Sequence, residues 1–290
     1  MKGIILAAGY ATRLYPLTLN TAKALLPIGE RPIIDYITDQ MLTLPDLDQI
    51  IVVSNHRFAS QFAKWADHRT RTDPASAVVI TIVDDGTTDE TNRLGAIGDI
   101  RYCIDQMKID DDLLVIAGDN LFTYQLADAW HYFRQHGEDM ILAQGLPPEE
   151  DLRRFAIVVV DEQGLVTDLE EKPEIPKTNL AVFATYFYLR NTLPLIAQYL
   201  KEGNNPDSPG HFPVWLYHRK PVRVYFFDGF CIDIGTPQSY EDVRTTFPLS
   251  VAREQYRREK RHQKPRTAVN SGLVKNEQKC VRFPADNAAD

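Results

Sequence analysis

The stretch from Lys2 to Tyr36, KGIILAAGYATRLYPLTLNTAKALLPIGERPIIDY, decides the fold of this chain. Its apolar run Ile4–Leu6 has the length of a buried strand, and Ala7–Gly9 then removes side chains where the backbone must turn. Small residues at such a turn let backbone amides approach an anion. About twenty residues separate this turn from the next helical pattern, which begins near Pro32, and connections of that length are usually functional. The pattern predicts a strand that runs into an anion-binding loop.

Two cations lie within this loop. Arg13 and Lys23 belong to a segment otherwise rich in proline and leucine, so we expect a rigid frame to display them. A polyphosphate would match two such cations. The alternative is that any α/β domain opens with an apolar strand and a glycine turn, and that both cations are only solvated. For Gly9 taken alone, this alternative would be the better interpretation.

Composition bounds the class of protein. At 290 residues, 44% of them hydrophobic and 25% charged, the chain is long enough to bury a full core. Its net charge of -8 argues against a broad nucleic-acid surface, so we expect no nucleic-acid partner. A bound polyanion must then be held by a local cluster of cations or by a metal.

The cysteines and the hydropathy pattern indicate a compartment. Cys103, Cys231 and Cys280 are widely spaced and odd in number, which fits neither a disulfide framework nor a zinc site, so a reducing cytoplasm is the simplest inference. The chain enters its first strand without a basic or cleavable apolar leader, and no apolar run approaches the roughly 18 residues of a membrane span. We expect a soluble, cytoplasmic protein with no membrane partner.

Apolar strand patterns alternate with helical patterns through the first half of the chain. Strands are predicted at 50–53, 78–83 and 113–117, and helices at 34–44, 58–66 and 95–107. This alternation predicts an α/β fold with a parallel sheet covered by helices. Ligands bind at the carboxyl ends of such strands, so Gly9 and the residues after Ala117 should meet over one crevice.

The second half of the chain has a different pattern. Strand-like runs at 155–160, 165–169, 181–189 and 222–227 should extend the sheet. After Phe247 the pattern becomes a charged helix from Ser250 to His262, followed by a polar tail from Gln263 to Asp290. We therefore divide the chain into residues 1–247 and a loosely attached unit, 248–290.

Two aspartates follow predicted strand ends. Asp119 comes directly after the apolar run Leu113–Ala117, at the lip of the expected crevice. A magnesium ion beside a triphosphate needs only one or two carboxylates. A single aspartate at a strand end can instead cap a helix or form a turn. The second aspartate, Asp233 in FCIDIGTP (230–237), favours the metal interpretation.

Four motifs, in order over residues 2–247, resemble the signature of the sugar-phosphate nucleotidylyltransferases, the NDP-sugar pyrophosphorylases and glucose-1-phosphate thymidylyltransferase-like proteins. They are the loop with Gly9, Thr12-Arg13, Pro16-Leu17-Thr18, Lys23 and Pro27, then Gly118-Asp119-Asn120, Glu171-Lys172-Pro173 and Asp233-x-Gly235-Thr236-Pro237. The resemblance implies a Rossmann-like three-layer α/β/α nucleotidyltransferase fold with a mixed, mostly parallel sheet and a β-rich sugar-binding extension. It also implies Mg²⁺-dependent transfer of a nucleoside monophosphate from an NTP to a sugar 1-phosphate, giving an NDP-sugar and pyrophosphate, in a homo-oligomer.

The same resemblance assigns roles to individual residues. Arg13 and Lys23 would be catalytic, and Asp119 and Asp233 would share Mg²⁺. The nucleotide would be bound by Leu6, Ala8, Gly9, Thr12 and Gly95. The sugar phosphate would be bound by Asn120, Glu171, Lys172, Val182 and Tyr186. In this set Lys172 would hold the phosphate as a point charge, and Glu171 would accept hydrogen bonds from sugar hydroxyls.

Several positions depart from the family pattern. Ala11 stands where relatives often have a second glycine, and its methyl group disfavours a positive φ, so we expect altered loop geometry with the amide still available. Ala156 and Ala184 stand where relatives often have glycine near the sugar. Cys231 lies where a tryptophan often precedes the second aspartate. These departures leave the identity of the sugar open.

Recognition of the base is open as well. Gly95 could bring the backbone close to a base, or a helix start could simply need a small residue there for packing. Thymidylyl-transferring relatives commonly have glutamine near the position that Gly98 occupies. The sequence therefore does not name the nucleotide.

Three alternative functions fit the sequence less well. A glycosyltransferase on a similar sheet would usually show a paired-aspartate motif without the Arg13 and Lys23 loop. A non-catalytic regulatory subunit that binds nucleotide sugars would be favoured by loss of either cation or either aspartate, and all four are present. A dehydrogenase is the weakest alternative, because Gly9-Tyr10-Ala11 lacks the further glycines of a dinucleotide turn.

Overall fold

Helices and strands alternate along the part of the chain that the structure, a computed structural model, describes, residues 1–73 and 76–247. The strands are β1 (Lys2–Leu6), β2 (Pro27–Ile28), β3 (Arg31–Pro32), β4 (Gln49–Ser54), β5 (Val79–Asp84), β6 (Leu113–Ala117), β7 (Asn120–Phe122), β8 (Asp139–Gly145), β9 (Ala156–Val160), β10 (Val166–Glu171), β11 (Leu180–Tyr188), β12 (Val222–Phe226) and β13 (Cys231–Asp233). The α-helices are α1 (Ile33–Met41), α2 (His56–Thr72), α3 (Ala96–Met107), α4 (Leu126–His136), α5 (Leu193–Lys201) and α6 (His211–Leu216), and the short 3-10 helices are η1 (Thr12–Leu14), η2 (Lys23–Leu25), η3 (Leu152–Arg154) and η4 (Arg190–Thr192). A further helix covers residues 237–247, and the predicted unit 248–290 lies outside the described residues.

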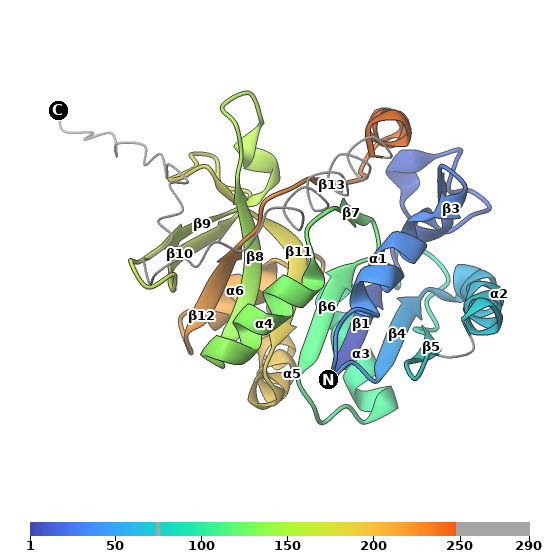
Figure 1. Cartoon of the computed structure of the whole chain (residues 1–290), viewed down its shortest axis with the longest axis horizontal. Coiled ribbons are helices and arrows are strands. Elements are labelled where there is room, and N and C mark those ends of the chain that lie inside the picture. The colour runs from blue at the N-terminus through green and yellow to red at the C-terminus, as the bar shows by residue number, and fades with distance from the viewer. Residues whose placement is uncertain (74–75, 248–290) are drawn as a thin grey trace, which may run out of the picture.

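A mixed nine-stranded sheet runs through the middle of the molecule (Figure 1). Its order is β10-β9-β11-β6-β1-β4-β5, with β8 paired to β11 and β12 paired to β8. In the half that holds β5, β4, β1 and β6, every pairing is parallel. These strands read as nearly continuous apolar runs because helices cover both faces of the sheet. The expected three-layer α/β architecture is confirmed.

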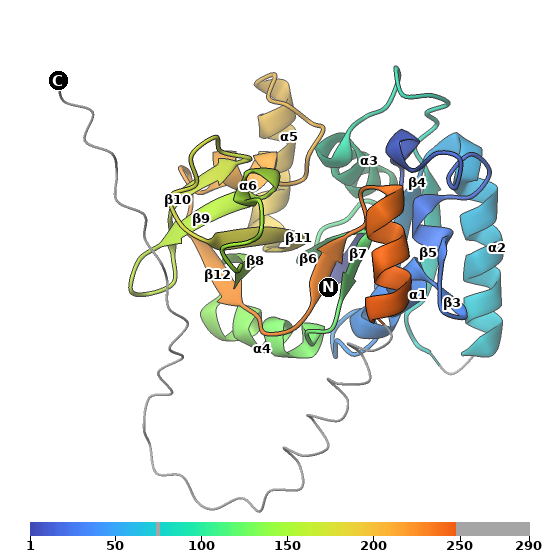
Figure 2. The ribbon, with the colours of Figure 1, turned by 90° about the horizontal axis from the view of Figure 1, so that it is seen from above.

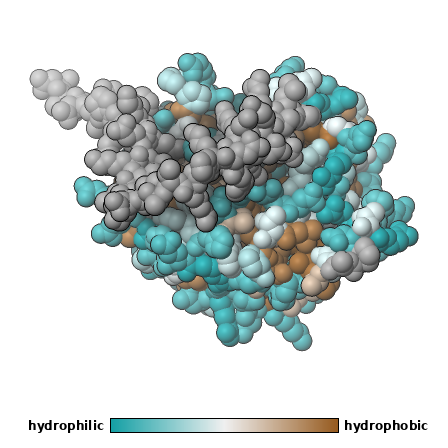
Figure 3. Space-filling model, viewed as in Figure 1, coloured by the Kyte–Doolittle hydropathy of each residue, from teal (hydrophilic) through white to brown (hydrophobic). Residues whose placement is uncertain are grey.

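The first strand shows how the two faces are filled. Ile5 points into a core shared with α1, α2 and α4, whereas Ile4 points into a core shared with α3, α5 and α6. Figure 2 shows α1 and α4 on one side of the sheet and α3, α5 and α6 on the other. The outer surface of the first face is largely hydrophilic, with a hydrophobic area near α1 and β4 (Figure 3). The parallel half therefore forms a rigid base for the loops at its strand ends.

The second half of the sheet is antiparallel around β11, which pairs with β6, β8 and β9. The sequence predicted β9, β10, β11 and β12 but missed β8. That strand begins at Asp139, a fully buried carboxylate that accepts a hydrogen bond from Thr192 and pairs with Lys220 at 2.7 Å. A charged residue inside a buried strand breaks the apolar pattern, because only its tertiary partners offset the cost of burial.

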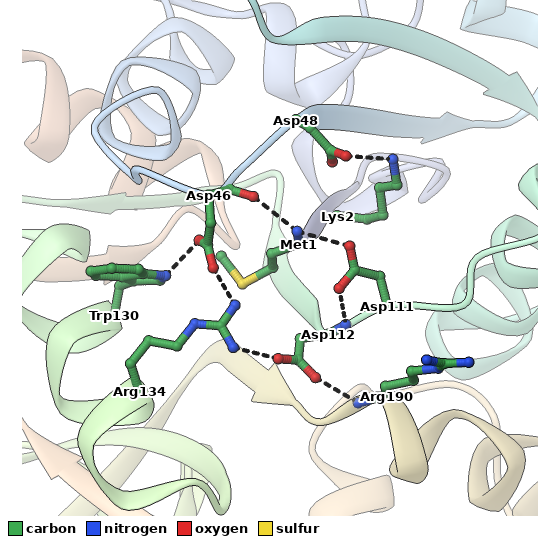
Figure 4. A network of polar contacts seen from close by, with 9 residues as sticks. All are labelled: Met1, Lys2, Asp46, Asp48, Asp111, Asp112, Trp130, Arg134 and Arg190. Carbon is green, nitrogen blue, oxygen red and sulfur yellow. Dashed lines mark hydrogen bonds and ion pairs between the residues drawn. The ribbon is translucent and has the colours of Figure 1, made fainter.

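At the amino ends of the parallel strands, ion pairs and hydrogen bonds form an amino-edge network of Met1, Lys2, Asp46, Asp48, Asp111, Asp112, Trp130, Arg134 and Arg190 (Figure 4). The Met1 ammonium lies 2.9 Å from Asp111, and Arg134 forms ion pairs with both Asp46 and Asp112. These contacts join the start of β1, the loop before β4, the loop before β6 and helix α4. In the described residues, no helix is both long and apolar enough to traverse a bilayer.

Candidate active site

Two aspartates from distant parts of the chain meet at the carboxyl ends of the parallel strands. Asp119 precedes β7, and Asp233 ends β13; these two strands pair antiparallel, with Asp233 opposite Asn120. The turn after β6 brings Asp119 into place, since the Gly118 amide donates to the Leu6 carbonyl at 2.8 Å. A Cβ on Gly118 would lie 2.8 Å from that same oxygen, so the turn needs glycine there.

Lys23 lies between the two carboxylates. Its Nζ is 2.5 Å from Asp119 Oδ2 and 3.6 Å from Asp233 Oδ1. The Lys23 side chain is only 15% exposed, and the short helix η2 holds its backbone. Three of the four charged residues that the sequence singled out are therefore in direct contact, although 96 residues of sequence separate Lys23 from Asp119.

The charges in this cluster are not balanced. The charge of Asp119 is the main cause that raises the pKa of Asp233 to about 7, and burial adds less because the Asp233 side chain is 58% exposed. Burial would also raise the pKa of Asp119, but the Lys23 ammonium holds that pKa below its ordinary value. Burial disfavours the charged form of Lys23, yet the two carboxylates raise its pKa overall. One ammonium thus does not neutralise two adjacent carboxylates, and a further positive charge at this site would be stabilised.

The donor set fits a hard divalent cation. Two carboxylates supply oxygen ligands, which Mg²⁺ prefers, and their unbalanced charge is the condition that such an ion would relieve. In residues 1–73 and 76–247, no group of three or more His, Cys, Asp or Glu side chains is placed to hold a metal. Asp119 and Asp233, which both lie close to Lys23 Nζ, are the residues that could hold Mg²⁺ at this site.

The loop after β1 presents backbone amides toward the same edge of the sheet. Within the described part of the chain, the amides of residues 8–13 donate to no protein acceptor, whereas the next one, at Leu14, donates to Ala11. The methyl group of Ala11 does not prevent a left-handed backbone: its φ is 50° and its ψ is 43°. The Thr18 hydroxyl donates to the Ala11 carbonyl at 2.8 Å and holds this turn. Successive unpaired amides of this kind form a concave anion site.

Arg13 lies on this loop and is exposed. Its positive charge acts to lower the pKa of Lys23, so the two cations lie near each other. Arg13 makes no ion pair with any described carboxylate. Of the predicted nucleotide residues, Leu6 ends β1, Ala8 is buried, and Gly9 and Thr12 are exposed on the loop.

Asn55 supports this loop and was missed by sequence reasoning. Its fully buried amide donates to the Ala8 carbonyl at 2.8 Å, and its oxygen accepts from the Phe58 amide at the start of α2. An asparagine between a buried strand and a helix is a recognisable N-cap signal. The contact with Ala8 depends on the distant pairing of β1 and β4, which the local sequence does not reveal.

The structure gives a packing reason for glycine at position 95. Gly95 precedes α3 with φ 77°, and a Cβ there would lie 2.7 Å from the Pro206 carbonyl oxygen. The Ile97 amide donates to that carbonyl at 2.9 Å. Packing and backbone conformation therefore require glycine at this position, and its contact with a nucleotide stays a prediction.

The predicted sugar-side residues gather on the antiparallel half. Glu171 and Val182 both lie opposite Ala156, so they occupy one row across β10, β9 and β11. Burial, with a contribution from the Glu171 charge, raises the pKa of the Tyr186 hydroxyl. Lys172 has φ 53° and a side chain that is 60% exposed.

Asn120 lies apart from this row, beside Asp119. It is 2% exposed, and its Nδ2 has no hydrogen-bond partner among the described residues. Cys231 is half-buried and lies near the two aspartates. Burial, followed by the charge of Asp233, raises the pKa of its thiol, so this cysteine is a neutral side chain.

A family model described as nucleotidyl transferase matches residues 2–248. The chain belongs to this family. This nucleotidyl transferase is 30% identical over 235 residues to a glucose-1-phosphate thymidylyltransferase of Neisseria meningitidis, across 79% of this chain and 72% of the relative. It is 27% identical over 249 residues to a UTP–glucose-1-phosphate uridylyltransferase of Synechocystis, across 84% of this chain and 63% of the relative.

A solved structure of a UDP-glucose pyrophosphorylase with UDP-glucose superposes on this nucleotidyl transferase with a TM-score of 0.71 and 19% identity, across 86% of this chain and 98% of that one. That likeness shows the fold. The chain spans less than two thirds of the length of several relatives, such as 63% of the Synechocystis protein and 59% of a glycan-biosynthesis nucleotidyltransferase of Haloferax volcanii.

Proposed function

We propose that this nucleotidyl transferase is an enzyme that transfers a nucleoside monophosphate from an NTP to a sugar 1-phosphate, forming an NDP-sugar and pyrophosphate. The observation that supports it best is the convergence of Lys23, Asp119 and Asp233 beside a loop whose amides have no protein acceptor. Relatives named for thymidylyl and uridylyl transfer to glucose 1-phosphate support the same reaction class.

The reaction needs no general base. A phosphate oxygen of the sugar 1-phosphate attacks the α-phosphorus of the NTP, the bond from that phosphorus to the bridging oxygen breaks, and pyrophosphate leaves with the electron pair. The attacking oxygen is already ionised at neutral pH. Positioning and charge neutralisation are then the main contributions that the protein can make.

The residues of the loop supply that neutralisation. The free amides of residues 8–13 bind phosphate oxygens of the NTP, and Lys23, kept protonated by its two carboxylates, contacts the same phosphates. Arg13, exposed and unpaired with any described carboxylate, contacts the departing pyrophosphate. A Mg²⁺ ion held by Asp119 and Asp233 would neutralise phosphate charge when bound.

The antiparallel half binds the acceptor. Lys172, with its exposed ammonium, holds the sugar phosphate, and Glu171 accepts hydrogen bonds from sugar hydroxyls. Outside this half, Asn120 of β7 lies beside Asp119 and has a buried Nδ2 without a described partner, which supports a donor role toward the acceptor. Val182 and Tyr186 of β11 lie next to Glu171 and line the acceptor site.

A substrate grid tests the proposal. Five NTPs are incubated with a panel of sugar 1-phosphates, Mg²⁺ and pyrophosphatase, and the phosphate released is measured. At least one pair should turn over, Lys23→Met should lower its turnover, and Lys64→Met, a control at an exposed lysine of α2, should retain it.

Two outcomes would contradict the proposal. Release of NDP only from an NDP-sugar would indicate a glycosyltransferase. Binding of nucleotide sugars without any turnover would indicate a regulatory subunit.

A further inference from the structure

The segment 204–210, between α5 and α6, contacts the carboxylate of Glu171. The Ser208 hydroxyl donates to Glu171 Oε1 at 3.0 Å, and the Glu171 side chain is only 13% exposed. Lys172, the neighbouring cation, lies farther away, at 3.9 Å from the same oxygen. The direct partner of this carboxylate is thus a serine that lies 37 positions farther along the chain.

Gly210 leaves space for the same carboxylate. A Cβ built on Gly210 would meet Glu171 Oε2 at 2.3 Å, and its three nearest atoms would all belong to Glu171. The backbone of Gly210 has φ −67° and ψ −21°, which any residue adopts without strain. A side chain at this position would therefore displace the Glu171 carboxylate from the place it occupies, while the backbone conformation itself does not require glycine.

The segment is anchored at both ends. The Tyr199 hydroxyl of α5 donates to the Asn205 carbonyl at 2.6 Å. On the other side, the Pro206 carbonyl accepts from Ile97 in α3, and Asp207 pairs with Arg93 at 2.9 Å. Residues 204–210 therefore connect the helix that follows Gly95 with the carboxylate of Glu171.

We propose that Ser208 and Gly210 are positioning residues that fix the Glu171 carboxylate for the hydroxyls of the acceptor sugar. This inference rests on the proposed function. A carboxylate can accept about four hydrogen bonds, so the one from Ser208 leaves capacity for the sugar. A carboxylate fixed before binding loses less conformational entropy when the sugar arrives, so the affinity for the sugar should depend on this support.

The test measures KM for both substrates in single variants. Ser208→Ala and Gly210→Ala should each raise KM for the sugar 1-phosphate about fivefold, the size of the entropy cost of fixing one side chain on binding, with KM for the NTP unchanged. Ser208→Thr, which keeps the hydroxyl, should restore KM to near the wild-type value. Ser60→Ala, at an exposed position of α2, is the matched control and should change neither KM.

A double-mutant cycle separates positioning from a general structural effect. In a Glu171→Ala background, Ser208→Ala and Gly210→Ala should have no further effect on KM for the sugar 1-phosphate. Equal shifts in both backgrounds, or unshifted KM in an active Gly210→Ala enzyme, would overturn this inference while the proposed function stands. A wild-type protein that turns over no substrate pair would overturn the proposed function and, with it, the role of Glu171.

Discussion

Two groups of charged side chains at opposite edges of one sheet differ in how their charges are balanced. In the amino-edge network the ion pairs join Met1 to Asp111, Lys2 to Asp48, and Arg134 to both Asp46 and Asp112 (Figure 4). At the carboxyl edge, the Lys23 cluster places one ammonium against two aspartates, Asp119 and Asp233. The first group has three cations for its four carboxylates, and the second has one cation for two.

This difference separates stability from function. In the amino-edge network each of the four aspartates contacts a cation, so the contacts lower the energy of the folded state without any ligand. In the Lys23 cluster the pKa of Asp233 is raised to about 7, because the protein supplies too little positive charge. A cation and phosphates that arrive with the substrates can complete such a site. In the amino-edge network, by contrast, burial would raise the pKa of Asp111, but the Met1 ammonium holds it below its ordinary value.

The largest effect should follow from removing one carboxylate of the Lys23 cluster. Asp233→Asn should lower kcat about 100-fold to 1,000-fold, the range seen when one group that stabilises a transition state is lost. The melting temperature should be unchanged or slightly higher, because the variant removes the repulsion between Asp233 and Asp119. Phosphate release with pyrophosphatase, together with a thermal melt, checks both. Near-normal turnover by a folded variant would remove Asp233 from the mechanism.

A second acidic pair tests whether excess carboxylate is enough to mark a substrate site. Asp99 in α3 is buried beside Asp85, and burial, followed by the charge of Asp85, raises its pKa to about 8. The unfolded pKa is about 3.9, so between pH 4 and 8 folding retains a proton that the unfolded chain releases. Stability is therefore full below pH 4 and falls as the pH rises toward 8, by up to about 1.4 kcal/mol per pH unit.

Asp99→Asn should remove most of this pH dependence. The asparagine keeps a donor toward Asp85, so the free energy of unfolding should exceed that of the wild type by roughly 2–3 kcal/mol at pH 8 and by much less at pH 5. Denaturant melts at both pH values measure the difference, and kcat should stay close to the wild-type value. Equal stability gains at both pH values would show that Asp99 is ionised in the folded protein.

The amino-edge network should affect stability alone. Arg134 contacts Asp46 and Asp112, and its side chain is 34% exposed. Arg134→Met leaves both carboxylates without this partner, so we expect a loss of about 2 kcal/mol, between the values for surface and buried pairs. A denaturant melt measures this loss.

The control for this change is Arg153→Met, which breaks an exposed pair with Asp151 and should cost little. Turnover of the folded Arg134→Met protein should equal that of the wild type. A selective loss of kcat would mean that the two edges are coupled, and the comparison between them would fail.

The sequence predicted the parallel half well because its strands are apolar on both faces. The motifs also placed Lys23, Asp119 and Asp233, since each follows or lies near a strand end or rigid turn. The pattern gave no signal for Ser208 or Gly210, which act on Glu171 only through the path of the loop between α5 and α6. It also missed β8, because the partners of Asp139 come from Leu189, Thr192 and Lys220.

The smallest effect concerns backbone strain, which is also concentrated at the carboxyl edge. Among the described residues, the non-glycine residues with positive φ are Ala11, Lys108 and Lys172, and two of these lie in the candidate site. Ala11→Gly removes a left-handed conformation that costs about 1 kcal/mol for alanine, although the greater freedom of glycine in the unfolded chain cancels part of the gain. The net result should be a stabilisation of about 0.5 kcal/mol.

Ala63→Gly, on the exposed side of α2, provides the matched control and should have the opposite sign, a loss of about 1 kcal/mol, because the same substitution there relieves no strain. Denaturant melts of the two variants give the comparison directly. Destabilisation of both by similar amounts would mean that Ala11 is unstrained in solution. The carboxyl edge would then differ from the amino edge in charge alone, and the strain at the loop would no longer count as a mark of the substrate site.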